Sequence, residues 1–164
     1  GRRGRIECHL GDTARTAWQR RRGGDGDDVQ FEGIDVDLGR WPHARVAYRT
    51  FSDDAHAAHF VELRRIFEER QEPFTVLVDL VGAQPLNAQQ RRDTSDFWKD
   101  VKPLAPGRML ALAFVIDNVV VRGIVRAISW IQPPPCEHRV FANAVDAQQW
   151  LAGQYAEQTQ RRSA

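Results

Sequence analysis

Two short apolar runs constrain the fold of this chain more than any other feature of its sequence. Residues 74–80 and 109–116 are rich in apolar and β-branched side chains, and neither shows the alternation of a strand with one face in water. Runs of this kind are typical of strands that are buried on both faces. The sequence therefore predicts a layered α/β domain in which helices bury these two central strands.

The segments around these runs alternate between strand and helix patterns. Residues 31–38 alternate apolar and polar side chains, and a second strand at 44–48 follows a turn at 39–42, so the two strands should pair as a hairpin. Helices are predicted over residues 53–70, 87–104, 119–131 and 144–157, with a short strand over 139–142. The order β-β-α-β-α-β-α-β-α predicts an N-terminal β-hairpin followed by alternating helices and strands, in a mixed sheet of about five strands with about four helices.

Local signals support the helix boundaries. Ser52 or Asp53 is positioned to cap the first helix. Asn87 should cap the second helix, with Gln90 at the capping-box position. The third helix should stop at the proline run 133–135.

The chain has 164 residues, enough for one domain with an ordinary core. Residues 1–30 are rich in Arg, Gly and Asp and contain no periodic apolar segment, which predicts a flexible tail. Residues 31–157 are predicted to form a single α/β domain, and residues 158–164 a C-terminal tail.

Charge and composition argue against several classes of protein. The chain carries 23 basic and 22 acidic residues, so its overall field does not favour nucleic acid and no nucleic-acid partner is expected. No run approaches 18 consecutive apolar residues, and no membrane span is expected. The two cysteines, Cys8 and Cys136, do not form a disulfide framework, which favours a reducing, cytoplasmic location.

Two local patterns accompany the predicted order of elements. Residues 76–80 (VLVDL) are followed after six residues by 87–90 (NAQQ). Residues 113–117 (AFVID) lead into a helix and then into the proline-rich turn 130–135 (WIQPPP). With the element order over residues 31–154, these patterns resemble the STAS superfamily, specifically the SpoIIAA-like branch that is grouped with the CRAL-TRIO (Sec14-type) lipid-binding domains. The resemblance implies a regulatory protein-binding module or, through CRAL-TRIO, a carrier of apolar ligands.

The sequence departs from the STAS pattern at the start of the second helix. Regulatory STAS domains carry Asp-Ser-Ser-Gly there, and a serine of that motif accepts a phosphate that switches partner binding. Here the position falls on Ala88 and Gln89, which have no hydroxyl. The hydroxyls of Thr94 and Ser95 lie a full turn or more inside the helix. The phosphorylation switch is therefore not expected in this chain.

His56, His59 and Glu62 have the spacing of a series of metal ligands. On a helix, however, His56 belongs to an apolar stripe with Phe60, Leu63 and Phe67. We therefore interpret His56 as buried and satisfied and His59 as lying on the flank of the stripe. Cys136 and His138 lack a second Cys/His pair at zinc spacing, and neither a metal nor a cofactor is predicted.

Asp79 and Asp117 end the two central strands, where open α/β sheets often place ligands. Paired carboxylates could perform acid/base or magnesium chemistry. The competing interpretation is that Asp117 and Asn118 cap the third helix. No G-x-S-x-G, P-loop or dinucleotide motif accompanies them, so no catalytic residue is predicted and a small hydrolase or metal enzyme is the least favoured function.

Two helix faces are candidates for partner binding. On the second helix, Phe97, Val101 and Leu104 should be buried, which leaves Trp98 outside. On the third, the expected inward residues are Val120, Ile124, Ala127, Ile128 and Ile131. The predicted partner-binding residues are Asn87, Arg91, Trp98, Arg122, Arg126 and Trp130. The alternative is that Trp130 packs on the proline-rich turn and the arginines are solvated.

The sequence thus favours a non-enzymatic STAS-like module that acts through protein–protein contacts, with a homodimer left open. The alternative is a domain that carries a lipid or another apolar small ligand. The small, Val-rich inner face of the third helix motivates it, because such a face could open a pocket rather than pack shut.

Overall fold

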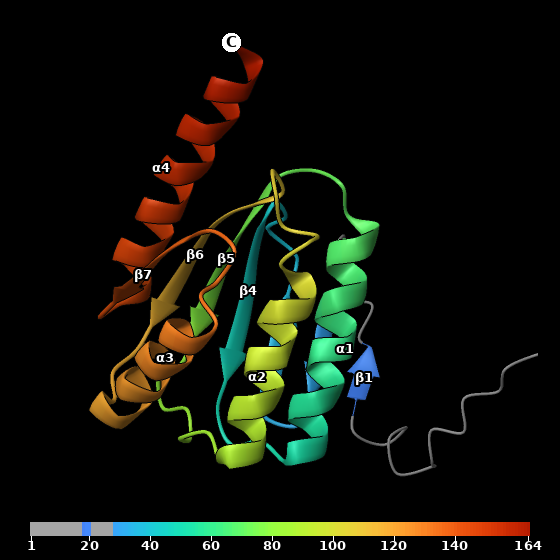
Figure 1. Ribbon diagram of the computed structural model, residues 1–164, viewed down its shortest axis with the longest axis vertical. Helices are drawn as coiled ribbons and strands as arrows, with labels where there is room; N and C mark the ends of the chain where they lie inside the picture. The colour runs from blue at the N-terminus through green and yellow to red at the C-terminus, as the bar shows by residue number, and fades with distance from the viewer. Residues whose placement is uncertain (1–17, 21–27) are drawn as a thin grey trace, which may run out of the picture.

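The computed structural model describes residues 18–20 and 28–164, and within them the chain forms an α/β fold with one mixed sheet (Figure 1). The strands are β1 Trp18–Arg20, β2 Val29–Phe31, β3 Ile34–Asp37, β4 His43–Tyr48, β5 Phe74–Asp79, β6 Met109–Val115 and β7 Glu137–Phe141. The helices are α1 Asp53–Glu69, α2 Ala88–Val101, α3 Val119–Ile131 and α4 Ala144–Ser163. The predicted fold class is confirmed, although the described part of the sheet has seven strands rather than about five.

Strand order in the sheet follows the order of the chain, from β1 at one edge to β7 at the other. Strands β1 to β4 form an antiparallel meander, and the predicted hairpin is its β3–β4 pair. Strands β4 to β7 are parallel, and α1, α2 and α3 cross between them. These three helices lie on one face of the sheet. The reason is that the crossovers between parallel strands share one handedness and all step in the same direction along the sheet.

Alternating side chains of the central strands divide the core in two. Leu112 and Phe114 of β6 face α1, α2 and α3, whereas Ala111 and Ala113 face α4. Helix α4 thus covers the opposite face of the sheet, where Leu151 packs on these small residues. This two-sided burial is the arrangement that the uninterrupted apolar runs predict.

The helix caps form as the sequence predicts. The Ser52 hydroxyl accepts a hydrogen bond from the amide of Ala55, at 3.2 Å, and so caps α1. Asn87 and Gln90 form a reciprocal capping box at the start of α2. These short-range hydrogen bonds satisfy amides that have no partner within the helix, so they can be predicted without tertiary information.

The expected strand over residues 31–38 is two strands joined by a tight turn at Glu32 and Gly33. Gly33 has φ +68°, and a Cβ atom there would lie 1.8 Å from the carbonyl oxygen of Thr50, so the turn requires glycine. The sheet also begins before residue 31, since Val29 is only 1% exposed. The rest of the predicted N-terminal tail, residues 1–17 and 21–27, lies outside the described residues.

The predicted C-terminal tail, residues 158–164, is wrong up to Ser163, because α4 continues to that residue. The Gln158 side chain donates a 3.0 Å hydrogen bond to the carbonyl oxygen of Leu110, just inside β6. Arg162 donates to the carbonyl oxygen of Gly107. These contacts hold the last turns of α4 against the start of β6 and the loop before it, although the sequence of residues 158–163 is too polar to predict such docking.

Candidate functional site

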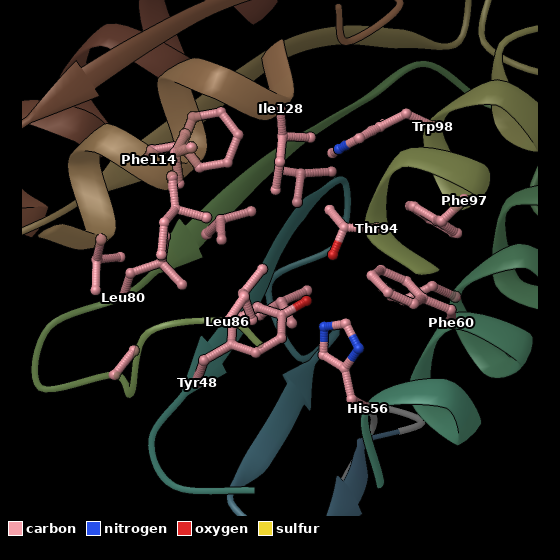
Figure 2. A pocket seen from close by; sticks show the side chains of 18 of the residues that line it. Tyr48, His56, Phe60, Leu80, Leu86, Thr94, Phe97, Trp98, Phe114 and Ile128 are labelled. Atoms are coloured by element: carbon pink, nitrogen blue, oxygen red, sulfur yellow. The ribbon is translucent and has the colours of Figure 1, made fainter. Parts of the chain in front are cut away.

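A cavity of about 90 Å³ lies between the sheet and helices α1, α2 and α3 (Figure 2). Figure 1 shows α1 and α2 side by side, with α3 set apart from them along the sheet. The cavity occupies the space where these helices diverge. Its lining includes Val46 and Tyr48 of β4, His56 and Phe60 of α1, Thr94 and Trp98 of α2, and Ile124 and Ile128 of α3.

The lining is almost entirely apolar. The lining side chains with a polar group are Tyr48, His56, Gln84, Thr94, Trp98 and Ser129 among the described residues, and none of the lining residues is Asp, Glu, Lys or Arg. Gln84 exchanges two hydrogen bonds with the backbone of Phe51, and the Thr94 hydroxyl donates to the carbonyl oxygen of Gln90 at 2.8 Å. Concave, apolar surfaces with a few polar groups are typical of small-molecule sites.

A buried hydrogen-bond chain joins β4 to α1 beside the cavity. Nδ1 of His59 faces the carbonyl oxygen of His56 and must donate to it, because a carbonyl only accepts. Nε2 of His59 therefore accepts from the Tyr48 hydroxyl, at 2.6 Å. Burial, with a further effect of His56, lowers the pKa of His59 well below its usual value, and burial raises that of Tyr48. Both groups are neutral, and both ring nitrogens of His59 have a partner.

His56 is buried as predicted, with 1% exposure, but it is not satisfied. Its Nδ1 is buried without a hydrogen-bond partner. The ring stacks on Phe51, with centroids 5.2 Å apart, and meets Phe60 edge-on. Burial lowers the pKa of His56 to about 4, although the charges of Asp93 and Asp53 partly oppose the shift.

The predicted placement of His59 on the flank of the stripe is wrong, because His59 is completely buried. Glu62, the third member of the series, bonds to Arg65 on the same helix. Within the described residues, no three His, Cys, Asp or Glu side chains gather as a set that could hold a metal ion.

Asp79 and Asp117 have separate structural contacts. Asp79 is buried, forms ion pairs with Arg45 at 2.5 Å and Arg49 at 3.5 Å, and accepts from the amide of Val81. Burial raises its pKa, but the Val81 hydrogen bond and the two arginines outweigh burial and the net pKa is lowered. Asp117 is exposed and accepts from the amide of Gly82. Both carboxylates thus have hydrogen-bond donors that account for their positions.

The structure divides the predicted partner-binding residues among three places. Asn87 caps α2 and donates to Asp53, and Arg91 donates to the carbonyl oxygen of Leu86, so both hold the start of that helix. The exposure predicted for Trp98 is wrong, because its side chain is 8% exposed and lines the cavity. Helix α2 is buried both against α1 and beside the cavity, and its buried face is therefore wider than one stripe.

Helix α3 presents Arg122, Arg126 and Trp130 to solvent, as predicted. Its inner face, however, consists of Val121, Ile124, Val125 and Ile128. Val120, Ala127 and Ile131, which were expected to face inward, are exposed. The outer face of α3 is thus more apolar than the predicted orientation of the helix implies.

A search of protein-family models finds no matching family, and searches of curated proteins and of solved structures find no match. The α/β architecture is therefore supported by the structure alone. Among the helices of the described chain, none combines the length and the apolar character that crossing a lipid bilayer requires.

Sequence reasoning placed His56 in the core but did not find the cavity, nor Tyr48 as part of its wall. The one signal was the expected inner face of α3, of which Ile124 and Ile128 do line the cavity. Val121 and Val125 also line it, although they were not expected to face inward. The unpartnered nitrogen of His56 could be found only from the three-dimensional arrangement.

Proposed function

We propose that this chain is a non-enzymatic binding domain that holds a small apolar molecule between its sheet and helices α1, α2 and α3. The observation that supports it is the cavity of about 90 Å³, whose lining carries no charged side chain. Protein interiors are normally packed as densely as organic crystals, so a cavity of this size inside the main core is a departure from ordinary packing. A ligand would restore the contacts that the lining residues lack.

The size of the cavity limits the ligand. An engineered apolar cavity of about 150 Å³ is known to bind benzene, so this smaller cavity accommodates at most about one ring or one short alkyl chain. A whole phospholipid does not fit while α2 and α3 keep their positions. Among apolar ligands, the geometry favours a compact molecule over a membrane lipid.

The domain type that we propose is SpoIIAA-like, within the STAS superfamily. The N-terminal hairpin, the parallel βα units in chain order and the Asn87-capped helix after Asp79 and Leu80 support this assignment. The hydroxyl-free start of α2, at Ala88 and Gln89, supports a function without the phosphorylation switch of regulatory STAS domains.

A second candidate function is protein binding through the outer face of α3. Trp130, Ile131 and Val119 are 89%, 80% and 79% exposed, and Arg122 and Arg126 lie on the same helix. Exposed aromatic and arginine side chains are typical of interface hot spots. This face is the proposed contact surface for a protein partner or a second copy of the chain.

Toluene binding tests the cavity. We expect saturable binding by titration calorimetry and by amide chemical-shift changes confined to residues around the cavity. Val125→Phe places a larger side chain in the cavity and should abolish binding, whereas Val145→Phe adds the same ring to an exposed position of α4 and should leave it unchanged. Equal toluene affinity in the two variants would contradict the proposal.

A further inference from the structure

The imidazole of His56 differs from the other groups of the cavity wall in its hydrogen bonding. It is buried, it lines the cavity, and its Nδ1 has no hydrogen-bond partner. Figure 2 shows the ring between Tyr48 and Phe60, on the α1 side of the cavity. A buried polar atom without a partner is unfavourable, and such atoms are rare in native proteins, where each needs an explanation such as a bound molecule, an ordered water or strain.

His59 and the hydroxyl proton of Tyr48 already have hydrogen-bond partners. His59 uses one ring nitrogen for the carbonyl oxygen of His56 and the other for the Tyr48 hydroxyl. The hydroxyl proton of Tyr48 is therefore committed to His59, although its oxygen can still accept a bond. His56 and Tyr48, with ring centroids 6.5 Å apart, form a polar corner in a mostly apolar wall.

The charge of this corner selects the type of ligand group. His56 is uncharged at neutral pH because burial lowers its pKa to about 4. The negative charges that act on it come from Asp53 and Asp93, and no cationic side chain lines the cavity. A carboxylate or phosphate would lose its hydration without gaining a positive partner. A neutral hydroxyl or carbonyl carries no such penalty, and a neutral imidazole can donate or accept a hydrogen bond.

We propose that the cavity takes an apolar molecule that ends in one neutral hydrogen-bonding group, a hydroxyl or a carbonyl, and that His56 binds this group. This inference rests on the proposed function, because it requires the cavity to be a ligand site. It adds the chemical class of the ligand and its orientation: the polar end lies against α1, and the apolar part points toward α2 and α3.

Phenol and toluene have nearly the same shape and differ by a hydroxyl in place of a methyl group. Phenol is the better hydrated of the two, so a purely apolar cavity prefers toluene. With a hydrogen bond to His56, phenol should bind at least as tightly as toluene. His56→Phe should then lower the ratio of phenol to toluene affinity by about tenfold or more. Thr159→Val is the matched control, because its hydroxyl donates to the carbonyl oxygen of Tyr155 on α4, outside the cavity, and its removal should leave the ratio unchanged.

A second measurement does not require the variant to fold. In the wild-type protein, phenol should shift the ring ¹⁵N resonances of His56, and toluene should leave the protonation and hydrogen bonding of these nitrogens unchanged. Toluene binding without a phenol-specific ¹⁵N shift, or an affinity ratio unaffected by His56→Phe, would overturn the role of His56 while the cavity function stands. Failure of both molecules to bind would overturn both proposals.

Discussion

The Tyr48 hydroxyl donates a 2.6 Å hydrogen bond to Nε2 of His59, the nitrogen left unprotonated when Nδ1 donates to the carbonyl oxygen of His56. It joins the end of β4 to the middle of α1 in a region from which water is excluded. The bond also orients the wall of the cavity, because the other nitrogen of His59 contacts the backbone of His56.

Tyr48→Phe should destabilise the fold by about 1–3 kcal/mol, because it leaves Nε2 of His59 buried without a donor. The measurement is the free energy of unfolding from urea denaturation. Tyr155 is a half-buried residue of α4, on the other face of the sheet. Tyr155→Phe should change stability by no more than about 0.5 kcal/mol. Equal stability of the two variants would show that the Tyr48–His59 bond contributes nothing.

Stability should rise with pH between about 4 and 6.5, because His56 and His59 are buried and neutral. Their pKa values are lowered on folding, so below pH 6.5 the unfolded chain takes up protons that the folded protein does not. Each imidazole then contributes up to about 1.4 kcal/mol per pH unit. The lowered pKa of Asp79 acts in the same direction but at more acidic pH. Denaturant midpoints from pH 4.5 to 7.5 provide the measurement, and a flat profile would contradict the neutral, buried state.

The two tryptophans on neighbouring helices should respond very differently to truncation. Trp98→Ala removes a buried indole and should cost about 3–5 kcal/mol. Trp130→Ala removes an exposed indole and should cost no more than about 1 kcal/mol. Thermal melts of the two variants provide the comparison. A large loss for Trp130→Ala would mean that this side chain packs on the proline-rich turn after all.

Replacement of Arg122, Arg126 and Trp130 together by Ala tests the outer face of α3. If this face binds a protein partner or a second copy, association should be lost while stability falls by about 1 kcal/mol or less. Sedimentation velocity over a concentration series measures self-association, and a melt on the same samples measures stability. Unchanged association in the triple variant would remove this face as the contact surface.

The fold could be predicted because its signals are local. The runs in β5 and β6 are too apolar for any position but the middle of a sheet, and the capping box at Asn87 and Gln90 uses residues three apart. The turn at Gly33 was missed although the alternation of Ile34, Val36 and Leu38 breaks there. Glu32 falls where an apolar residue is expected, and Phe31 is out of phase with the three.

The orientation of α3 could not be predicted for a different reason. Apolar residues occupy most of its positions, so the pattern is compatible with more than one buried stripe, and only the position of the helix on the sheet selects Val121 over Val120. The cavity is even harder to predict from the sequence. Its volume depends on how far α3 lies from α2, and no local pattern encodes a separation between two helices.

The agreement of strand order with chain order has a consequence for how the domain assembles. Each strand has to find only the strand that precedes it, so every pairing closes a loop of at most one βα unit. Growth of the sheet from β1 toward β7 can therefore proceed during synthesis, as each new unit emerges. The residues around the cavity all lie between Leu38 and Ser129, so this compartment is complete before β7 and α4 have joined the sheet.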